Sequence, residues 1–231
     1  MAAPLVLDNP VWAALTGPHA HLAERHGGAV RYHADLSPFH AIAGPDAWPD
    51  LAALAGPDGR VFMSGPFLDL PGGWTADRMI PGVQLTGEGV RGAPDPEAVE
   101  LTGADVPEVL DLVARTEPGP FRKRTTELGR YLGVRRDGVL VAMAGERLRV
   151  PGWTEISAVC TDPAHRGQGL AARLVRALAH GIQARGEHPF LAAAADNVNA
   201  VRLYQALGFT VRQDVTFAVV HAPAPDAHLR G

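Results

Sequence analysis

The segment that most restricts the fold of this chain is a glycine-rich turn between an expected strand and an expected helix. The apolar run Ile156 to Cys160 precedes it, and apolar residues at helical spacing follow it from Leu170 to Ile182. The turn itself contains Arg166, Gly167 and Gly169. Glycine lets a backbone approach a ligand closely, and the first N–H groups of a helix lack partners within the helix. Because the helix dipole also favours an anion there, the turn predicts a pyrophosphate site.

A second pattern follows this turn, after an apolar strand expected at 189 to 195. It runs Asn197-x-x-Ala200-x-x-Leu203-Tyr204-x-x-Leu207-Gly208-Phe209. Together and in this order, the two patterns resemble the GNAT superfamily of acyl-CoA-dependent N-acyltransferases. The resemblance covers roughly residues 94 to 222. Either pattern alone would be weak evidence, whereas the ordered pair is specific.

The resemblance implies where coenzyme A binds. In the family, the pattern R-x-x-G-x-A holds the coenzyme pyrophosphate, and the strand before it and an asparagine after it contact the pantetheine arm. A backbone N–H near 159 to 161 would stabilise the oxyanion, where the family separates two strands to admit the pantetheine. The implied coenzyme contacts are Val159, Thr161, Arg166, Gly167, Gln168, Gly169, Leu170, Ala171 and Asn197.

A third run narrows the resemblance to one branch of the superfamily. It is Phe121-x-x-Arg124-Thr125-x-x-Leu128-Gly129-x-Tyr131-x-Gly133. This run is similar to that of the glycine N-acyltransferase-like members. Acetyl is the usual donor of the superfamily, but this branch leaves longer and aromatic acyl groups open.

Acyl transfer from a thioester to an amine needs a neutral amine and a proton for the departing thiolate. An amine of pKa about 10 is only about one part in a thousand neutral at pH 7, so a nearby base is useful. Glu155 is a candidate base, acting through water, because its spacing to Arg166 is similar to that of a catalytic glutamate in several family members. Tyr204 is implied as the general acid, since the matching tyrosine lies beside the coenzyme sulfur.

Each of these side chains also has a structural interpretation. Glu155 is equally well explained as a solvated or structural carboxylate, and Tyr204 as a core aromatic at helical spacing. Asn197 stands at a strand-to-helix junction, where asparagine is a common N-cap. Cys160 raises a covalent acyl-cysteine route, but a cysteine ending an apolar strand is usually a small buried hydrophobic residue, and no histidine is placed to activate it.

Two other functions compete with the enzyme. The run Gly167 to Ala172 also matches the dinucleotide fingerprint G-x-G-x-x-A, but five residues separate its first glycine from the strand, and the acid at Asp196 comes later than a ribose partner would. A GNAT-like protein that binds acyl-CoA as a sensor or scaffold without turnover is the more serious alternative. The presence of Tyr204 and Glu155 argues against it.

Composition excludes several partners. A net charge of −4 and the absence of any long basic run predict no binding to nucleic acid or to an anionic membrane. One cysteine excludes an intrachain disulfide, and the ten histidines show no metal spacing, so no metal site is expected. The lone cysteine favours a reducing, cytoplasmic setting, and Asp8, Asn9 and Pro10 interrupt any leader-like apolar stretch. A homodimer stays open.

The chain is expected to form two domains, 1–93 and 94–231, because residues 87 to 96 are polar and turn-rich. The first has no named motif, and frequent Pro and Gly predict short elements there, with one strand at 61 to 63; by analogy with tandem members of the superfamily, a degenerate GNAT-like copy is considered. In the second, Asp105 and Glu108 predict a capping box for a helix ending near Ala114. Further strands are expected at 99, 131 to 135, 139 to 146, 153 to 160, 189 to 195 and 211 to 220, and further helices at 170 to 182 and 200 to 207.

The expected fold is therefore α/β (α+β): a GNAT-type mixed, mostly antiparallel twisted sheet with helices on both faces, preceded by a smaller N-terminal α/β domain. The expected function is transfer of an acetyl group from acetyl-CoA to a primary amine of a small molecule, amino acid or peptide, by direct attack. The acceptor would be selected by loops around 116 to 130 and 211 to 217 and by the first domain.

Overall fold

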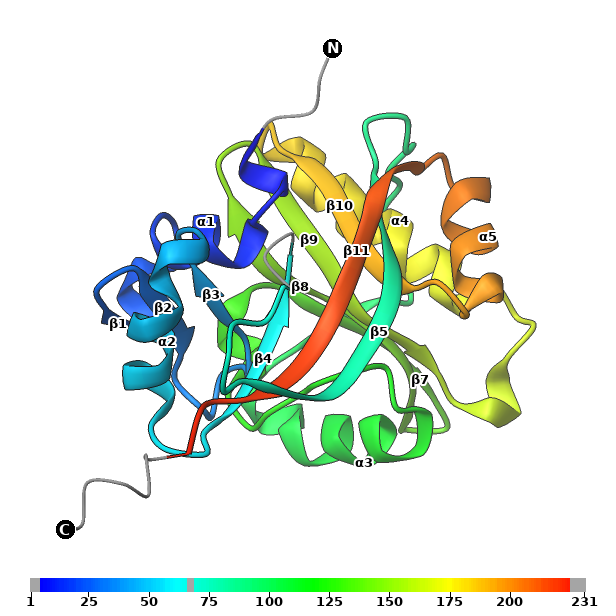
Figure 1. Cartoon of the computed structure of the whole chain (residues 1–231). Coiled ribbons are helices and arrows are strands. Elements are labelled where there is room, and N and C mark those ends of the chain that lie inside the picture. Colours follow the sequence, from blue (N-terminus) through cyan, green and yellow to red (C-terminus); the bar gives the residue numbers. More distant parts are fainter. Residues whose placement is uncertain (1–4, 66–68, 225–231) are drawn as a thin grey trace, which may run out of the picture.

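The computed structural model of this chain describes residues 5–65 and 69–224, which form a small sheet and a large one. The small sheet is antiparallel in the order β1-β2-β3, and the large one has the order β4-β11-β5-β10-β9-β8-β7-β6 (Figure 1). The strands are β1 (Ala23–His26), β2 (Ala29–Tyr32), β3 (His40–Ile42), β4 (Arg60–Ser64), β5 (Thr75–Thr86), β6 (Val99–Leu101), β7 (Tyr131–Arg136), β8 (Val139–Val150), β9 (Trp153–Thr161), β10 (His188–Ala194) and β11 (Thr210–His221). The helices are α1 (Pro10–Leu15), α2 (Trp48–Ala55), α3 (Val106–Thr116), α4 (Leu170–Ala184) and α5 (Val198–Ala206).

Helices cover both faces of the large sheet. Leu132 of β7 belongs to an apolar cluster with Leu178 of α4, whereas its neighbour Tyr131 belongs to a second cluster with Leu112 of α3. Adjacent strand residues point to opposite faces, so α4 and α3 lie on opposite sides. All neighbouring strands of this sheet run antiparallel except β9 and β10. The predicted fold class is thereby confirmed.

The long strand β5 was not expected, because frequent Pro and Gly in the first ninety-odd residues predict short elements there. The structure explains why Pro81 is tolerated. Strand β11 pairs with β5 along its whole length, but β10 pairs only with Gly82 to Thr86. Pro81 therefore lies one position beyond the part of β5 that pairs with β10. Only its carbonyl is used there, as the acceptor for the Ala195 N–H at 2.9 Å, so the missing N–H leaves no described strand pairing incomplete. The prediction that every early element is short was wrong for β5.

The strands β4 and β5 lie before residue 94 in the sequence, yet both belong to the large sheet. The predicted division into domains 1–93 and 94–231 stays a prediction, and residues 1–4 and 225–231 of these domains lie outside the described residues. Strand pairing crosses this boundary, because β5 pairs with β10 and β11 in the same sheet. The part specific to the N-terminus is the small sheet with α1 and α2, drawn in blue in Figure 1.

The start of α3 differs from the prediction in one detail. The capping box joins Thr102 and Asp105 around the preceding 3-10 turn, instead of Asp105 and Glu108. Glu108 and Asp105 both accept hydrogen bonds from Arg135 of β7, which anchors the helix to the sheet. Thr102 followed by Asp105 is as good a capping-box pattern as Asp105 followed by Glu108, so local chemistry alone does not distinguish the two patterns.

No helix in residues 5–65 and 69–224 is long and apolar enough to cross a membrane. In the same residues, no group of three or more His, Cys, Asp or Glu side chains could hold a metal ion.

Candidate functional site

The predicted glycine turn lies at the N-terminus of α4. Gly167 and Gly169 have φ values of +79° and +74°, and Gly169 is the N-cap of the helix. A left-handed conformation suits glycine because it has no Cβ. No atom lies within 4 Å of the position that a Cβ would take at either residue, so the turn is open on its outer side. The first N–H groups of α4 thus face a space that an anion could fill.

Strands β9 and β10 separate beside this turn. They pair in parallel over only three positions, from Trp153 with His188 to Glu155 with Phe190, although both strands continue further. Beyond that point β9 has a bulge opposite β8, where Ala158 adopts a φ of +53°. The two strands therefore diverge where the sequence predicts an opening for the pantetheine, between Val159 and the end of β10.

One orphaned polar atom faces this region. The Oγ1 of Thr161 is buried and has no hydrogen-bond partner within the described part of the chain. A buried hydroxyl without a partner is costly, so a ligand atom or water is expected to satisfy it. Together with the open glycine turn, this orphaned hydroxyl fits the chemistry of a polar coenzyme arm. Arg166 lies at the same place, and its Nε donates to the carbonyl oxygen of Thr161 at 3.4 Å.

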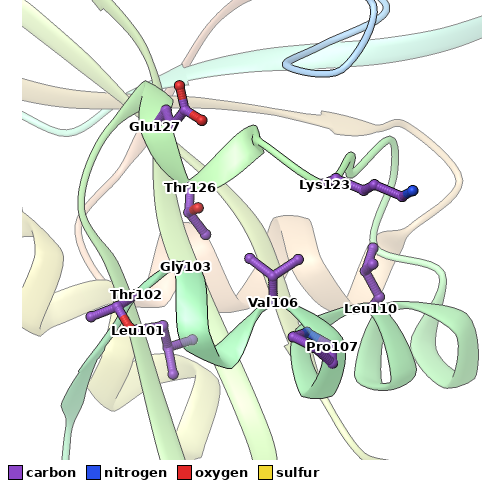
Figure 2. Close-up of a pocket in the computed structure, with 9 residues that line it drawn as sticks. All are labelled: Leu101, Thr102, Gly103, Val106, Pro107, Leu110, Lys123, Thr126 and Glu127. Carbon is purple, nitrogen blue, oxygen red and sulfur yellow. The ribbon is translucent and has the colours of Figure 1, made fainter.

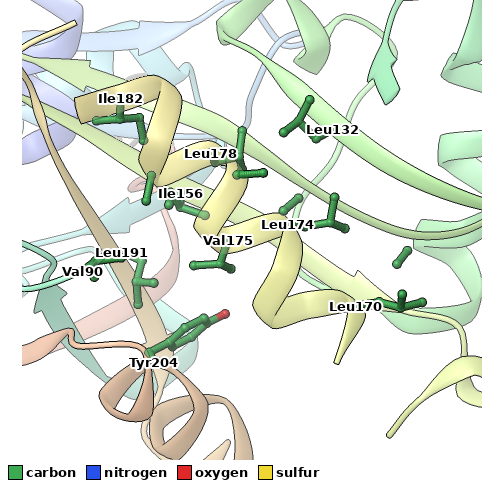
Figure 3. Close-up of a cluster of buried hydrophobic side chains, with 14 of the residues drawn as sticks. Val90, Leu132, Ile156, Leu170, Leu174, Val175, Leu178, Ile182, Leu191 and Tyr204 are labelled. Atoms are coloured by element: carbon green, nitrogen blue, oxygen red, sulfur yellow. The ribbon is translucent and has the colours of Figure 1, made fainter. Parts of the chain in front are cut away.

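Tyr204 of α5 lies on the face of the sheet that α4 covers. It belongs to the apolar cluster of Val175 and Leu191, and Figure 3 shows its hydroxyl directed toward α4. Burial, followed by the nearby thiol of Cys160, raises the pKa of the Tyr204 phenol to about 12. The phenol therefore stays protonated at ordinary pH, as a proton donor must. The ring also packs edge-on against Phe209, with 6.0 Å between centroids.

Glu155 lies on the other face. Its neighbour Ile156 belongs to the α4 cluster with Tyr204, and adjacent strand residues point to opposite sides. The carboxylate is buried and accepts two hydrogen bonds from Arg147 of β8, from Nε and Nη2, each 2.7 Å long. The Arg147 guanidinium lies over the ring of Phe39, 4.7 Å from its centroid. Glu155 and Tyr204 thus flank the separated strands from opposite sides.

Asn197 has the structural role that its position suggests. Its side-chain oxygen accepts a hydrogen bond from the Ala200 N–H at 3.2 Å and caps α5. The predicted contact with a pantetheine arm would use the remaining amide N–H donors, so the two roles are compatible.

Cys160 is buried, and this burial raises the pKa of its thiol. Because the thiolate is the reactive form, this environment favours the interpretation as a small hydrophobic residue over a covalent acyl carrier.

A cavity elsewhere in the described part of the chain is lined by none of the predicted site residues. It has a volume of about 580 Å³ and lies between the start of α3 and the 3-10 helix Thr125–Leu128 (Figure 2). Its wall includes Leu101 of the edge strand β6. In the sheet register Leu101 stands opposite Tyr131, then Gly145, then Ser157 of β9. Three strand spacings amount to about 14 Å, so this cavity is remote from the separated strands.

Sequence reasoning missed Arg147 and Phe39. Arg147 had a usable signal, since a hairpin turning at Pro151-Gly152 brings the residues around 147 next to Glu155. Phe39 had none, because it meets the sheet only through the folding of the N-terminal part.

Comparison with known proteins reveals relatives of this chain. The family model for FR47-like protein matches residues 131–218. The N-alpha-acetyltransferase RimI of Mycobacterium tuberculosis is 36% identical over an alignment of 120 residues, which covers 47% of this chain and 75% of that protein.

Solved structures extend this similarity to almost the whole chain. A candidate acetyltransferase of the GNAT family from Novosphingobium aromaticivorans is 40% identical, with a TM-score of 0.89 over 96% of this chain and 100% of its own. A GCN5-related N-acetyltransferase from Kribbella flavida has a TM-score of 0.65 over 97% of this chain and 98% of its own. At 16% identity, the latter likeness concerns the fold alone.

Proposed function

This chain belongs to the GNAT family of acyl-CoA-dependent N-acetyltransferases, and we propose that it transfers an acetyl group from acetyl-CoA to a primary amine by direct attack. The observation that carries the proposal is the separation of β9 from β10 beside the open turn at the start of α4. An acyl donor held by that turn would present its acyl end between the two strands. The donor supplies an activated acyl group, and the protein supplies orientation and proton transfer.

We assign the coenzyme contacts to the turn and its flanks. The first-turn N–H groups of α4 and the side chain of Arg166 would neutralise the pyrophosphate. Thr161, with its orphaned hydroxyl, and the β9 backbone at Val159 would line the pantetheine path. The remaining proposed contacts are Gly167, Gln168, Gly169, Leu170, Ala171 and Asn197.

We assign the two proton-transfer roles to Tyr204 and Glu155. Tyr204 would donate a proton to the departing thiolate, for which its neutral phenol is suited. Glu155 would accept the proton of the amine through one water. Two hydrogen bonds from Arg147 hold the carboxylate in place, yet each oxygen retains a lone pair for that water.

The acceptor is proposed at the level of a primary amine. The Mycobacterium tuberculosis relative is an N-alpha-acetyltransferase, which makes an α-amino group one class to test. Its match covers less than half of this chain, so this likeness says nothing about the acceptor contacts of the remaining residues. The glycine N-acyltransferase-like run at 121 to 133 keeps small amines in the test set as well.

The proposal predicts acetyl-CoA binding and a specific role for one hydroxyl. In a calorimetric titration, acetyl-CoA should bind with micromolar affinity and NAD should not bind.

Substitution Tyr204→Phe should lower kcat by about 10² without altering acetyl-CoA affinity, because it removes only a proton donor. Thiol release on addition of amines measures kcat.

Phe209→Leu is the matched control, since it disturbs the same ring contact without removing a hydroxyl. An equal loss in both variants would assign the effect to packing. Coenzyme binding with no thiol release from any amine or peptide would point to a sensor instead of an enzyme.

A further inference from the structure

The cavity between the start of α3 and the 3-10 helix Thr125–Leu128 has no role in the function proposed above. Its apolar wall consists of Val106, Pro107 and Leu110 of α3 together with Leu101 of β6. Its volume of about 580 Å³ lies within the range of small-molecule sites. An apolar wall of this extent favours a ligand with a hydrocarbon body, because binding removes both surfaces from water.

The two walls of this cavity are anchored independently of each other. Arg135 of β7 holds the start of α3 through its two carboxylate partners described above. On the other wall, Thr125 donates its hydroxyl hydrogen to the Leu36 carbonyl at 2.6 Å, and the Arg124 N–H donates to the Asp35 carbonyl at 3.0 Å. A ligand would therefore enter a cavity that is already formed, and little of its binding free energy would be lost to ordering the walls.

Lys123 supplies the charge of this cavity. The wall also contains Glu127, but Arg124 neutralises that carboxylate with two hydrogen bonds, each 2.7 Å long. Figure 2 shows the Glu127 carboxylate directed away from α3 and the Lys123 side chain over Leu110. No carboxylate in the described part of the chain forms an ion pair with the Lys123 ammonium. A cation beside apolar surface attracts an anion with an apolar body and repels a protonated amine.

This cavity is separate from the coenzyme turn and from the gap between β9 and β10. It lies along the first turns of α3, up to Leu110. Thr116, the last residue of α3, is the part of the helix that contacts Cys160 of β9. The six residues from Leu110 to Thr116 span about 9 Å along the helix. A ligand in the cavity and a coenzyme at the turn could therefore be bound at the same time.

We propose that this cavity is a second binding site, which takes small monocarboxylates with a hydrocarbon body. The carboxylate pairs with Lys123 and accepts a hydrogen bond from the Thr126 hydroxyl, which lines the same wall. The hydrocarbon body lies against Val106 and Leu110. The inference is independent of the proposed acetyl transfer, because binding needs neither acetyl-CoA nor an amine.

The test is a calorimetric titration of the full chain with hexanoate, phenylacetate, acetate, hexanol and hexylamine. Hexanol has the hydrocarbon body without the charge, and acetate has the charge without the body. We expect hexanoate and phenylacetate to bind with one-to-one stoichiometry and about tenfold or more tighter than hexanol or acetate. Hexylamine should not bind.

Two substitutions at one position separate charge from shape. Lys123→Met should weaken hexanoate binding by about tenfold or more and leave hexanol binding unchanged, whereas Lys123→Arg should retain hexanoate binding. The matched control is Arg122→Met, because Arg122 is an adjacent exposed cation that does not line the cavity. The thermal midpoint of each variant shows whether it is folded.

The sequence offers a second measurement at the same position. Lys123 is the only lysine of the chain, so a lysine-directed label reports on this cavity alone. Hexanoate should slow the acetylation of Lys123 by acetic anhydride, and hexylamine should not. Mass spectrometry of the peptide that contains Lys123 measures the rate.

The proposal is overturned if hexanoate binds no tighter than acetate, or if Lys123→Met and the unaltered protein bind hexanoate equally well. An equal loss in Arg122→Met, or displacement of hexanoate by acetyl-CoA, would overturn it as well, since the anion would then bind elsewhere. These outcomes leave the proposed acetyltransferase function standing. Failure of acetyl-CoA to bind would overturn that function and leave this site standing.

Discussion

At the scale of single residues, the position of the Glu155 carboxylate depends most on Arg147. It donates both hydrogen bonds to the buried carboxylate of Glu155, and its guanidinium contacts Phe39 of the N-terminal part. A buried ion pair contributes little net stability, but removing one partner leaves an uncompensated charge. Arg147 is therefore interpreted as a positioning residue, which holds Glu155 toward the gap between β9 and β10.

Substitution Arg147→Met tests this interpretation by separating kcat from KM. Without Arg147, the Glu155 carboxylate loses both hydrogen bonds that orient it, so kcat should fall by about tenfold while the KM for acetyl-CoA changes little. The free energy of unfolding should also fall by about 3–5 kcal/mol. Initial rates at varied acetyl-CoA and urea unfolding measure the two effects.

Arg185→Met is the control for that prediction. Arg185 pairs with another buried carboxylate, Glu146 of β8, at 3.0 Å. Burial raises the pKa of Glu146, and Arg185 opposes this rise. Its loss should lower stability and leave kcat nearly unchanged. An equal fall of kcat in both variants would mean that Arg147 has no special relation to the reacting base.

At the scale of elements, the contact between β7 and β8 depends on the absence of a side chain. Gly145 of β8 stands opposite Tyr131 of β7, and a Cβ at Gly145 would overlap the Tyr131 ring. Tyr131 is fully buried and packs edge-on against Phe121, with 5.5 Å between centroids. The ring therefore has no room to move, and its place over glycine keeps the two strands close.

Substitution Gly145→Ala should lower the free energy of unfolding by about 1–3 kcal/mol, since the added methyl group overpacks the interface. Urea unfolding measures this change. Gly103→Ala is the matched control, because no atom lies within 4 Å of a Cβ at Gly103. Equal stability of the Gly145 variant and the unaltered protein would show that the Tyr131 ring can shift.

At the scale of the whole molecule, two buried histidines couple the N-terminal part to pH. Burial lowers the pKa of His19 and of His40 to about 4. The His19 ring nitrogen lies 2.8 Å from the hydroxyl of Tyr32, and that of His40 lies 2.8 Å from the Pro38 carbonyl. Both histidines belong to the N-terminal part, so acid should weaken the packing of that part first.

The sign of the effect follows from proton binding. Below pH 6.5 the unfolded chain takes up protons at both histidines, whereas the folded protein does so only near pH 4. The free energy of unfolding should therefore decrease as the pH is lowered through this window, by about 2 kcal/mol per histidine at pH 5. Urea unfolding at pH 7, 6 and 5 measures it, and His40→Gln should remove about half of the loss. A flat profile between pH 7 and 5 would contradict this account.

Features that depend on residues close together in the chain could be predicted from the sequence. Periodicity and turn residues located most of the helices and strands from β6 to β11, and glycine at Gly167 and Gly169 predicted the open turn before α4. Asn197 was foreseen as an N-cap and forms one. Each of these features is set within about one helical turn or one hairpin, where local hydrogen bonding and backbone sterics decide the outcome.

The contacts between distant segments could not be predicted in this way and were found in the folded chain. In the fold, β5 lies between β11 and β10, Asp8 forms an ion pair with Arg212, and Phe39 contacts Arg147. The proposed catalytic roles of Glu155 and Tyr204 stay predictions. They lie on opposite faces of the sheet because Tyr204 packs in the cluster that contains Ile156, whereas Glu155, the neighbour of Ile156 on β9, points the other way. Contacts of this kind bury surface between residues far apart in the chain, so no local pattern records them.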